Sequence, residues 1–163
     1  MRDSDFERLY AEHAERLLGF LTYRTGDRAL AEDLLADTFE RVLRTRIRFD
    51  RRRGREKTWI YSIALNLLRD SVRRREAEAR ALERSEVAVG SPASPPPDTD
   101  ALSDRDAIHR ALETLTAEER EAIALRYGGD FTVPEIAKLT GERLSTVEGR
   151  VYRALRKLRS EIT

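Results

Sequence analysis

The chain has 163 residues, of which 40% are hydrophobic and 37% charged, so it can form one ordinary domain or two small ones. It has no cysteine and two histidines that lie far apart in sequence, which excludes disulfides and argues against a metal site or another bound cofactor. No apolar run approaches the roughly 20 residues that span a bilayer, and the charged N-terminus does not resemble a signal peptide, so we expect a cytoplasmic protein without membrane insertion.

The net charge of +1 conceals a segregation of charge along the chain. Residues 41–84 hold 15 basic and 6 acidic residues, and residues 120–163 hold 9 and 6, whereas the segments 1–40 and 85–119 are acidic. One basic block alone is most often a solvated surface. Two such blocks in two domains favour binding to a polyanion such as DNA.

A proline-rich segment divides the chain. The run Gly90–Asp98 can be neither helix nor central strand, because proline has a restricted φ and no N–H. We therefore predict an all-α protein with two small helical domains, residues 1–78 and 103–163, joined by a flexible linker over 79–102. We expect the two modules to fold separately and to leave their arginines open to DNA.

The first domain is predicted to contain three or four helices. Ser4–Glu7 has the form of a capping box, and helical spacing of apolar residues then continues to a break at Gly26. A second helix is expected over 28–44 and a third over 58–75, with a basic loop over 46–57 between them. Each helix is too short to be stable alone, so they must pack on one another.

The second domain is predicted to end in a helix-turn-helix. A helix over 104–113 and one that starts with a capping box at Thr116 come first. Thr132 then caps a short helix with proline in its first turn, Gly141 provides a left-handed C-terminal cap, and Ser145–Glu148 caps a second helix that runs to about residue 159. The alternative is a helical hairpin whose arginines are merely solvated.

The second helix of this motif has a basic outer side, which is typical of a DNA recognition helix. Residues at the start of such a helix reach base edges, and later ones meet phosphates. We assign base reading to Ser145, Thr146, Glu148 and Gly149, either role to Arg150, and phosphate contacts to Arg143, Arg153 and Lys157.

Three sets of motifs, in this order along the chain, resemble one known family. They are Ala31-Glu32-Asp33-Leu34 with Thr38-Phe39; Thr58-Trp59-Ile60 with Ile63-Ala64, Asn66, Asp70 and Arg73-Arg74; and Glu135-Ile136-Ala137 with Gly141, Thr146-Val147, Arg150 and Arg153-Ala154. Together they resemble bacterial RNA polymerase sigma factors of the extracytoplasmic-function (ECF) group of the sigma-70 family. Ala36, Thr116, Ser145 and Glu148 depart from the residues frequent in that family, and Glu148 bears directly on which promoter sequence is read.

The resemblance implies a sigma factor that binds core RNA polymerase and directs promoter-specific transcription initiation. The second helix would dock on the polymerase through Glu32, Asp33, Phe39 and Arg41. The basic loop and the third helix would bind and open the −10 element through Arg48, Phe49, Arg55, Lys57, Trp59, Tyr61, Asn66, Arg69, Arg73 and Arg74. The second domain would read the −35 element, and an anti-sigma factor would supply control in trans.

Some assignments stay open at this level. Phe39 and Trp59 are equally compatible with core positions, and Asn66 with capping a neighbouring carbonyl. The alternative function is an autonomous helix-turn-helix regulator, although we find no dimerisation helix or ligand-binding domain. An enzyme is disfavoured, because the sequence shows no glycine-rich phosphate loop, metal-ligand cluster or nucleophile–base pair.

Overall fold

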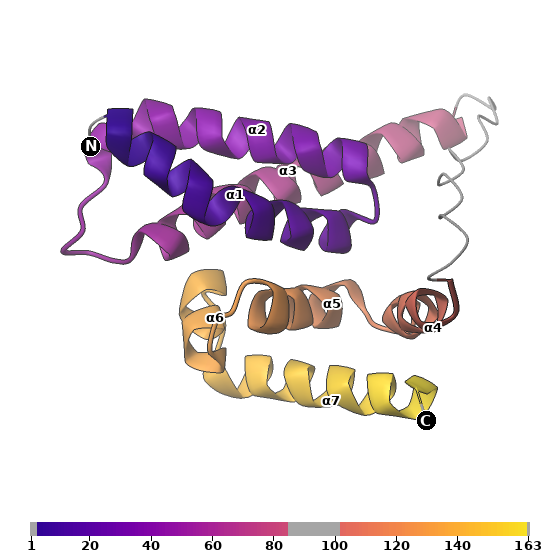
Figure 1. The fold of residues 1–163 in the computed structure, drawn as a ribbon. Helices are drawn as coiled ribbons and strands as arrows, with labels where there is room; N and C mark the ends of the chain where they lie inside the picture. The colour runs from indigo at the N-terminus through magenta and orange to yellow at the C-terminus, as the bar shows by residue number, and fades with distance from the viewer. Residues whose placement is uncertain (1–2, 85–101, 163) are drawn as a thin grey trace.

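The computed structural model describes residues 3–84 and 102–162, whose regular secondary structure is entirely helical. The elements are α1 (Asp3–Thr25), α2 (Arg28–Thr45), the 3-10 turn η1 (Arg46–Arg48), α3 (Glu56–Arg84), α4 (Leu102–Glu113), α5 (Ala117–Ile123), the π-helical segment η2 (Ala124–Gly128), α6 (Val133–Thr140) and α7 (Leu144–Ile162). Figure 1 shows α1–α3 as one group of helices, the first module, and α4–α7 as a second group beside it, the second module. The predicted all-α fold is confirmed.

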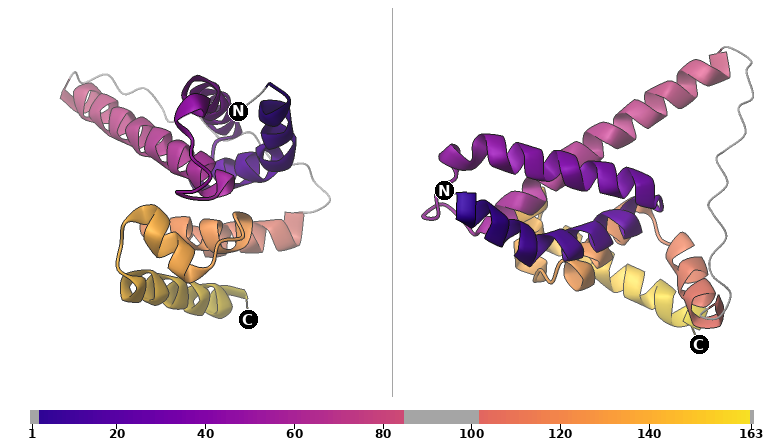
Figure 2. Two further views of the ribbon diagram at one scale, coloured as in Figure 1. Left: turned by 90° about the vertical axis from the view of Figure 1, so that its left-hand side faces the viewer. Right: turned by 45° about the horizontal axis from the view of Figure 1, so that its top comes forward.

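Helix α3 is longer than the sequence pattern predicts. It continues from the expected end at residue 75 to Arg84, and its side chains beyond Val72 are exposed. The prediction ended the helix where the apolar stripe ends, but residues 76–84 are mostly alanine, glutamate, arginine and leucine, which favour helix without burial. In Figure 2 this part of α3 projects beyond the packed helices. The proline run Gly90–Asp98 lies outside the described residues.

The predicted helix ends are partly right. Thr116 forms the expected capping box with Glu119, Thr132 caps α6, and Gly141 ends α6 with a φ of 70°. The predicted caps at Ser4 and Ser145 are wrong, because both residues lie inside a helix. Helix α7 begins at Leu144, where the backbone carbonyl of Arg143 accepts hydrogen bonds from two amides of the first turn.

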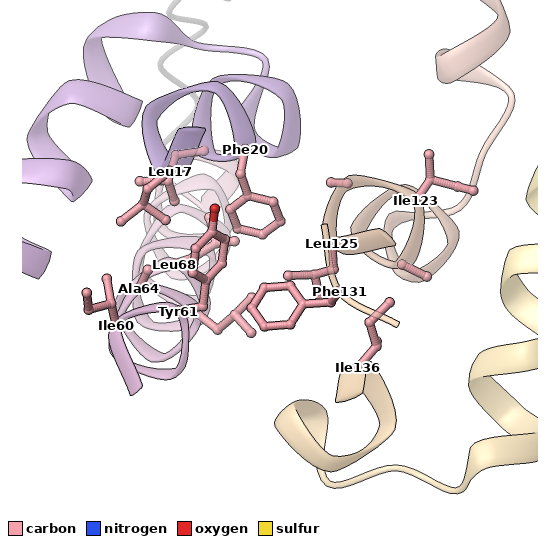
Figure 3. Close-up of a cluster of buried hydrophobic side chains, with 14 of the residues drawn as sticks. Leu17, Phe20, Ile60, Tyr61, Ala64, Leu68, Ile123, Leu125, Phe131 and Ile136 are labelled. Atoms are coloured by element: carbon pink, nitrogen blue, oxygen red, sulfur yellow. The ribbon is translucent and has the colours of Figure 1, made fainter. Parts of the chain in front are cut away.

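The two modules pack against each other more closely than we expected. The Phe131 ring, from the second module, lies 5.0 Å from the ring of Tyr61 on α3, which itself contacts Phe20 on α1 (Figure 3). Lys57 Nζ lies 4.1 Å from the Phe131 ring centre and donates a hydrogen bond to the carbonyl of Asp130. The hydrophobic interiors of the modules are therefore continuous in this arrangement.

Three ion pairs border this aromatic contact, one of them between Arg16 on α1 and Asp130 at 3.8 Å. Glu121 on α5 lies 3.6 Å from Arg24 on α1 and 3.8 Å from Arg69 on α3. We call these contacts the junction. It consists of Arg16, Arg24, Lys57, Tyr61 and Arg69 against Glu121, Asp130 and Phe131.

Candidate nucleic-acid interface

The outward face of α7 is the expected DNA-reading surface. Val147, Val151 and Ala154 are buried against the rest of the second module. The opposite side of the helix carries exposed Ser145, Glu148, Tyr152 and Arg156, and Tyr152 is 68% exposed. The sequence analysis missed Tyr152 and Arg156. Their helical spacing from Ser145 and Glu148 was the signal that could have found them.

Two of the predicted DNA-binding cations on α7 are held by acids of the same module. Arg150 forms an ion pair with Glu142 in the turn between α6 and α7. Lys157 Nζ lies 2.8 Å from Glu119 Oε2. Both cations lie on the flank of α7 rather than on its outer face, so the expectation of an open arginine and lysine row is wrong for them in this arrangement.

Arg153 differs from these two residues. Its guanidinium lies 3.9 Å from Glu119, yet 58% of its side chain is exposed. It also covers Gly149, because a Cβ built there would lie 3.0 Å from Arg153 Nη1. Arg153 therefore remains accessible to a phosphate next to the base-reading end of the helix.

Glu119 has an unusual environment for a carboxylate. It is buried, accepts a hydrogen bond from the backbone N–H of Thr116, and receives another from Lys157. Burial alone raises the pKa of this carboxyl, but the two hydrogen bonds together with the positive charges of Lys157 and Arg153 hold the pKa below its ordinary value. The ionised carboxylate therefore fastens α5 to α7.

Glu119→Gln is expected to lower the free energy of unfolding by about 1–3 kcal/mol at neutral pH, because Lys157 loses a charged partner. The pKa of the Glu119 carboxyl is lower in the folded protein than in the unfolded chain. The ionised carboxylate therefore stabilises the fold at pH values above the unfolded pKa. This stabilisation is lost as the pH falls through the folded pKa. The difference between variant and wild type should therefore close as the pH falls from about 5 to about 3. Urea unfolding at both pH values measures this difference in free energy, and Glu118→Gln, at an exposed position, is the control. An equal difference at both pH values would contradict this role.

A hollow lies beside the start of α3 in the first module. Its volume is about 250 Å³, and Arg48, Phe49, Asp50, Arg53, Gly54, Arg55, Thr58, Trp59 and Ser62 line it. The Phe49 and Trp59 rings are stacked with 4.6 Å between their centres. Trp59 is half-buried, so it is neither a full core residue nor a fully free aromatic face. Four of the predicted −10 residues (Arg48, Phe49, Arg55 and Trp59) therefore meet around one hollow.

The remaining predicted −10 residues divide into an exposed group and a group at the junction. Asn66, Arg73 and Arg74 are exposed, and Trp59, Asn66 and Arg73 share one face because they follow at seven-residue intervals. Lys57, Tyr61 and Arg69 belong to the junction.

Tyr61 requires a correction. It is 1% exposed and contacts Phe20 and Phe131, so its ring is a core element and not a free platform for a base. Burial raises the pKa of its hydroxyl to about 12. The sequence could not indicate this, because Phe131 lies in a turn of the other module.

The predicted polymerase-binding residues of α2 also divide into two groups. Glu32, Asp33 and Arg41 are exposed, and Glu32 forms an ion pair with Arg28 at 3.1 Å. Phe39 is 4% exposed and packs edge-on against two aromatic rings of α1, so its side chain belongs to the core. Asp37 and Glu40 are also exposed on this helix.

The described part of the chain holds neither a helix long and apolar enough for a bilayer crossing nor a group of three or more His, Cys, Asp or Glu suited to a metal ion.

Comparison with known proteins defines the class. Residues 9–78 match the family model for sigma-70 region 2, and residues 105–158 match that for sigma-70 region 4. These two ranges correspond to the two modules. The family matches cover both modules, so a stand-alone helix-turn-helix regulator is not favoured.

Individual relatives define the group. The chain is 36% identical to RNA polymerase sigma factor CarQ of Myxococcus xanthus over 94% of this chain and 87% of CarQ. It is 33% identical to ECF RNA polymerase sigma factor SigL of Mycobacterium tuberculosis over 93% of this chain and 85% of SigL. The chain therefore belongs to the ECF group of the sigma-70 family, whose members direct RNA polymerase to promoters and so initiate transcription.

Solved structures share the fold. The sigma factor RpoE, solved with the anti-sigma factor NepR from Bartonella quintana, aligns with a TM-score of 0.80 at 26% identity, over 97% of this chain and 96% of RpoE. CnrH, solved with the cytosolic domain of CnrY, aligns with a TM-score of 0.70 at 24% identity, over 99% of this chain and 89% of CnrH. The second likeness supports the fold only.

Proposed function

We propose that the two modules divide the promoter between them. The first module, within residues 1–78, binds core polymerase and the −10 element, and the second, within residues 103–163, reads the −35 element. The observation that carries this proposal is the hollow beside stacked Phe49 and Trp59, bordered by Arg48 and Arg55.

This hollow suits an unpaired nucleobase. A base that leaves the duplex stack can lie against an aromatic ring, and each such stack contributes about 1–3 kcal/mol. The arginines at the rim can hold the phosphates on either side of that base. Asn66 and Arg73, on the same face of α3 as Trp59, extend the contact along the strand.

The second module supplies sequence reading in duplex DNA. The N-terminal half of α7 enters the major groove, with Ser145, Thr146, Glu148 and Gly149 toward the bases. Arg143, Arg153 and the exposed Arg156 then meet phosphates on either side. The first module docks on core polymerase through the exposed side of α2, with Glu32, Asp33 and Arg41 as the contacts.

Promoter binding requires the modules to separate at the junction, because the junction covers Lys57 and part of Arg69. Three side-chain polar atoms among the described residues are buried without a hydrogen bond, namely Tyr23 Oη, Arg24 Nε and Tyr61 Oη. Arg24 and Tyr61 belong to the junction, and Tyr23 lines a cavity next to it. Arg24 Nε keeps its ion pair with Glu121, whereas a buried hydroxyl without a hydrogen bond, as in Tyr23 and Tyr61, costs free energy in the packed form. Separation returns the Arg24 guanidinium to water, which suits a reversible contact.

We further propose control by an anti-sigma protein in the cytoplasm, where core polymerase and the chromosome are found. RpoE and CnrH were each solved with such a partner or a partner domain. A largely apolar cavity of about 520 Å³ between α1 and the second module, lined in part by Phe20, Tyr23 and Ile123, offers a place for apolar side chains of that partner. The protein acts as a dissociable polymerase subunit and not as an enzyme.

Trp59→Ala tests the proposal. It is expected to reduce promoter-dependent transcription by reconstituted polymerase about 5- to 150-fold, the equivalent of one base stack. Trp59→Phe keeps an aromatic face and should retain most activity. Thermal unfolding of both variants controls for loss of packing.

The decisive comparison uses a template that is already unpaired across the −10 element. If Trp59 holds an unpaired base, Trp59→Ala also weakens binding to this template. Unchanged binding there, together with lowered stability, would mean that Trp59 is a packing residue only.

A further inference from the structure

Glu148 has no evident role within the chain. It is exposed, and its side chain makes no hydrogen bond or ion pair with any residue in the described ranges. The other acids next to α7 behave differently, because Glu142 holds Arg150 and Glu119 holds Lys157. Glu148 is thus an unpaired carboxylate on the outward face of α7, near the N-terminus of that helix.

Ordinary structural explanations do not account for this carboxylate. The residues three and four positions away are Leu144, Ser145, Val151 and Tyr152, so no cation is placed for an intrahelical ion pair. Helix α7 begins at Leu144, which puts Glu148 beyond the first turn, where the helix dipole stabilises an acid little.

A free carboxylate on a DNA-binding face weakens binding unless it finds a donor. Duplex DNA carries one negative charge per about 1.7 Å of its axis. A carboxylate offers acceptors only. In the major groove the donors are the N4 amino group of cytosine and the N6 amino group of adenine, whereas guanine N7 and O6 and thymine O4 are acceptors that repel it.

We propose that Glu148 determines promoter specificity by accepting a hydrogen bond from the exocyclic amino group of a cytosine or adenine in the −35 element. This proposal rests on the proposed reading of that element by the second module. The surroundings of Glu148 allow a close approach to the bases, because Ser145 and Gly149 beside it are small. The Arg153 guanidinium lies over Gly149 and offsets the charge of the carboxylate near the phosphates.

The test uses the whole protein with core polymerase on a promoter library randomised across the −35 element, read by sequencing the transcripts. Glu148→Ala is expected to reduce base discrimination at one base pair by about tenfold or more, and to raise binding to the other sequences because a negative charge is gone. Glu148→Gln should shift that position toward adenine, since glutamine pairs with adenine N6 and N7. Glu161→Gln, at the far end of the same helix, is the matched control and should leave the profile unchanged.

The base that the wild-type protein prefers at the affected position identifies the donor. A preference for cytosine or for adenine supports the proposal. Loss of a guanine or thymine preference, or an unchanged profile in both Glu148 variants, overturns it. Ser145→Arg adds a guanidinium to the same face and separates this failure from failure of the proposed function. If Ser145→Arg changes the profile and the Glu148 variants do not, only the role of Glu148 is wrong. If all three are silent, the second module does not read this element.

Discussion

A covalent cross-link between α1 and α5 is expected to abolish promoter-dependent transcription while the protein stays folded. The chain has no cysteine, so Arg24→Cys with Glu121→Cys provides the only two thiols, at positions whose native side chains lie 3.6 Å apart. A short, cleavable bifunctional thiol reagent would then hold the modules together. Lys57 and Arg69 would remain against the second module, and α7 could not reach a separate DNA site.

Each single-cysteine variant treated with the same reagent is the control for modification alone and should transcribe normally. Cleavage of the reagent should restore transcription to the cross-linked protein. Full activity of the cross-linked protein before cleavage would show that the packed arrangement itself binds promoters, and the proposed separation would be wrong.

Phe131→Ala is expected to lower the free energy of unfolding of the second module by about 3–5 kcal/mol, as for other buried phenylalanines. The ring is 0% exposed and contacts both Tyr61 and the Lys57 ammonium, and Figure 3 shows it directed toward Tyr61. Tyr127→Ala removes an exposed ring of the same module and should change stability by about 0.5 kcal/mol or less.

The single tryptophan makes this measurement selective. Trp59 fluorescence follows the first module, whereas far-ultraviolet circular dichroism follows both. In Phe131→Ala the dichroism transition should begin at lower urea concentration, while the fluorescence transition shifts less. Coincident transitions with the wild-type midpoint would contradict the role given to Phe131.

Local chemistry explains which parts of the fold could be predicted. The caps at Thr116 and Thr132 and the left-handed residue Gly141 depend on neighbours within a few residues, so the sequence reveals them. The end of α3 was misplaced because the prediction followed apolar periodicity, whereas its exposed last turns rely on intrinsic helix propensity.

The candidate site was harder to predict, because the wrong assignments concern residues whose contact partners are distant in sequence. Lys157 is held by Glu119, which is 38 residues earlier, and Tyr61 contacts Phe131 from the other module. No local sequence pattern indicates either contact. Residues whose exposure follows from helical periodicity alone, such as Ser145 and Asn66, are exposed as expected. Their DNA contacts stay predictions.

Run-off transcription with purified core polymerase tests the central claim most directly. The protein should bind promoter DNA weakly by itself, and should direct core polymerase to start transcripts at a defined distance from its −10 and −35 elements. Scrambling either element should remove the transcript. A protein that binds a palindromic site tightly on its own, and adds no promoter-dependent transcript to core polymerase, would contradict the account.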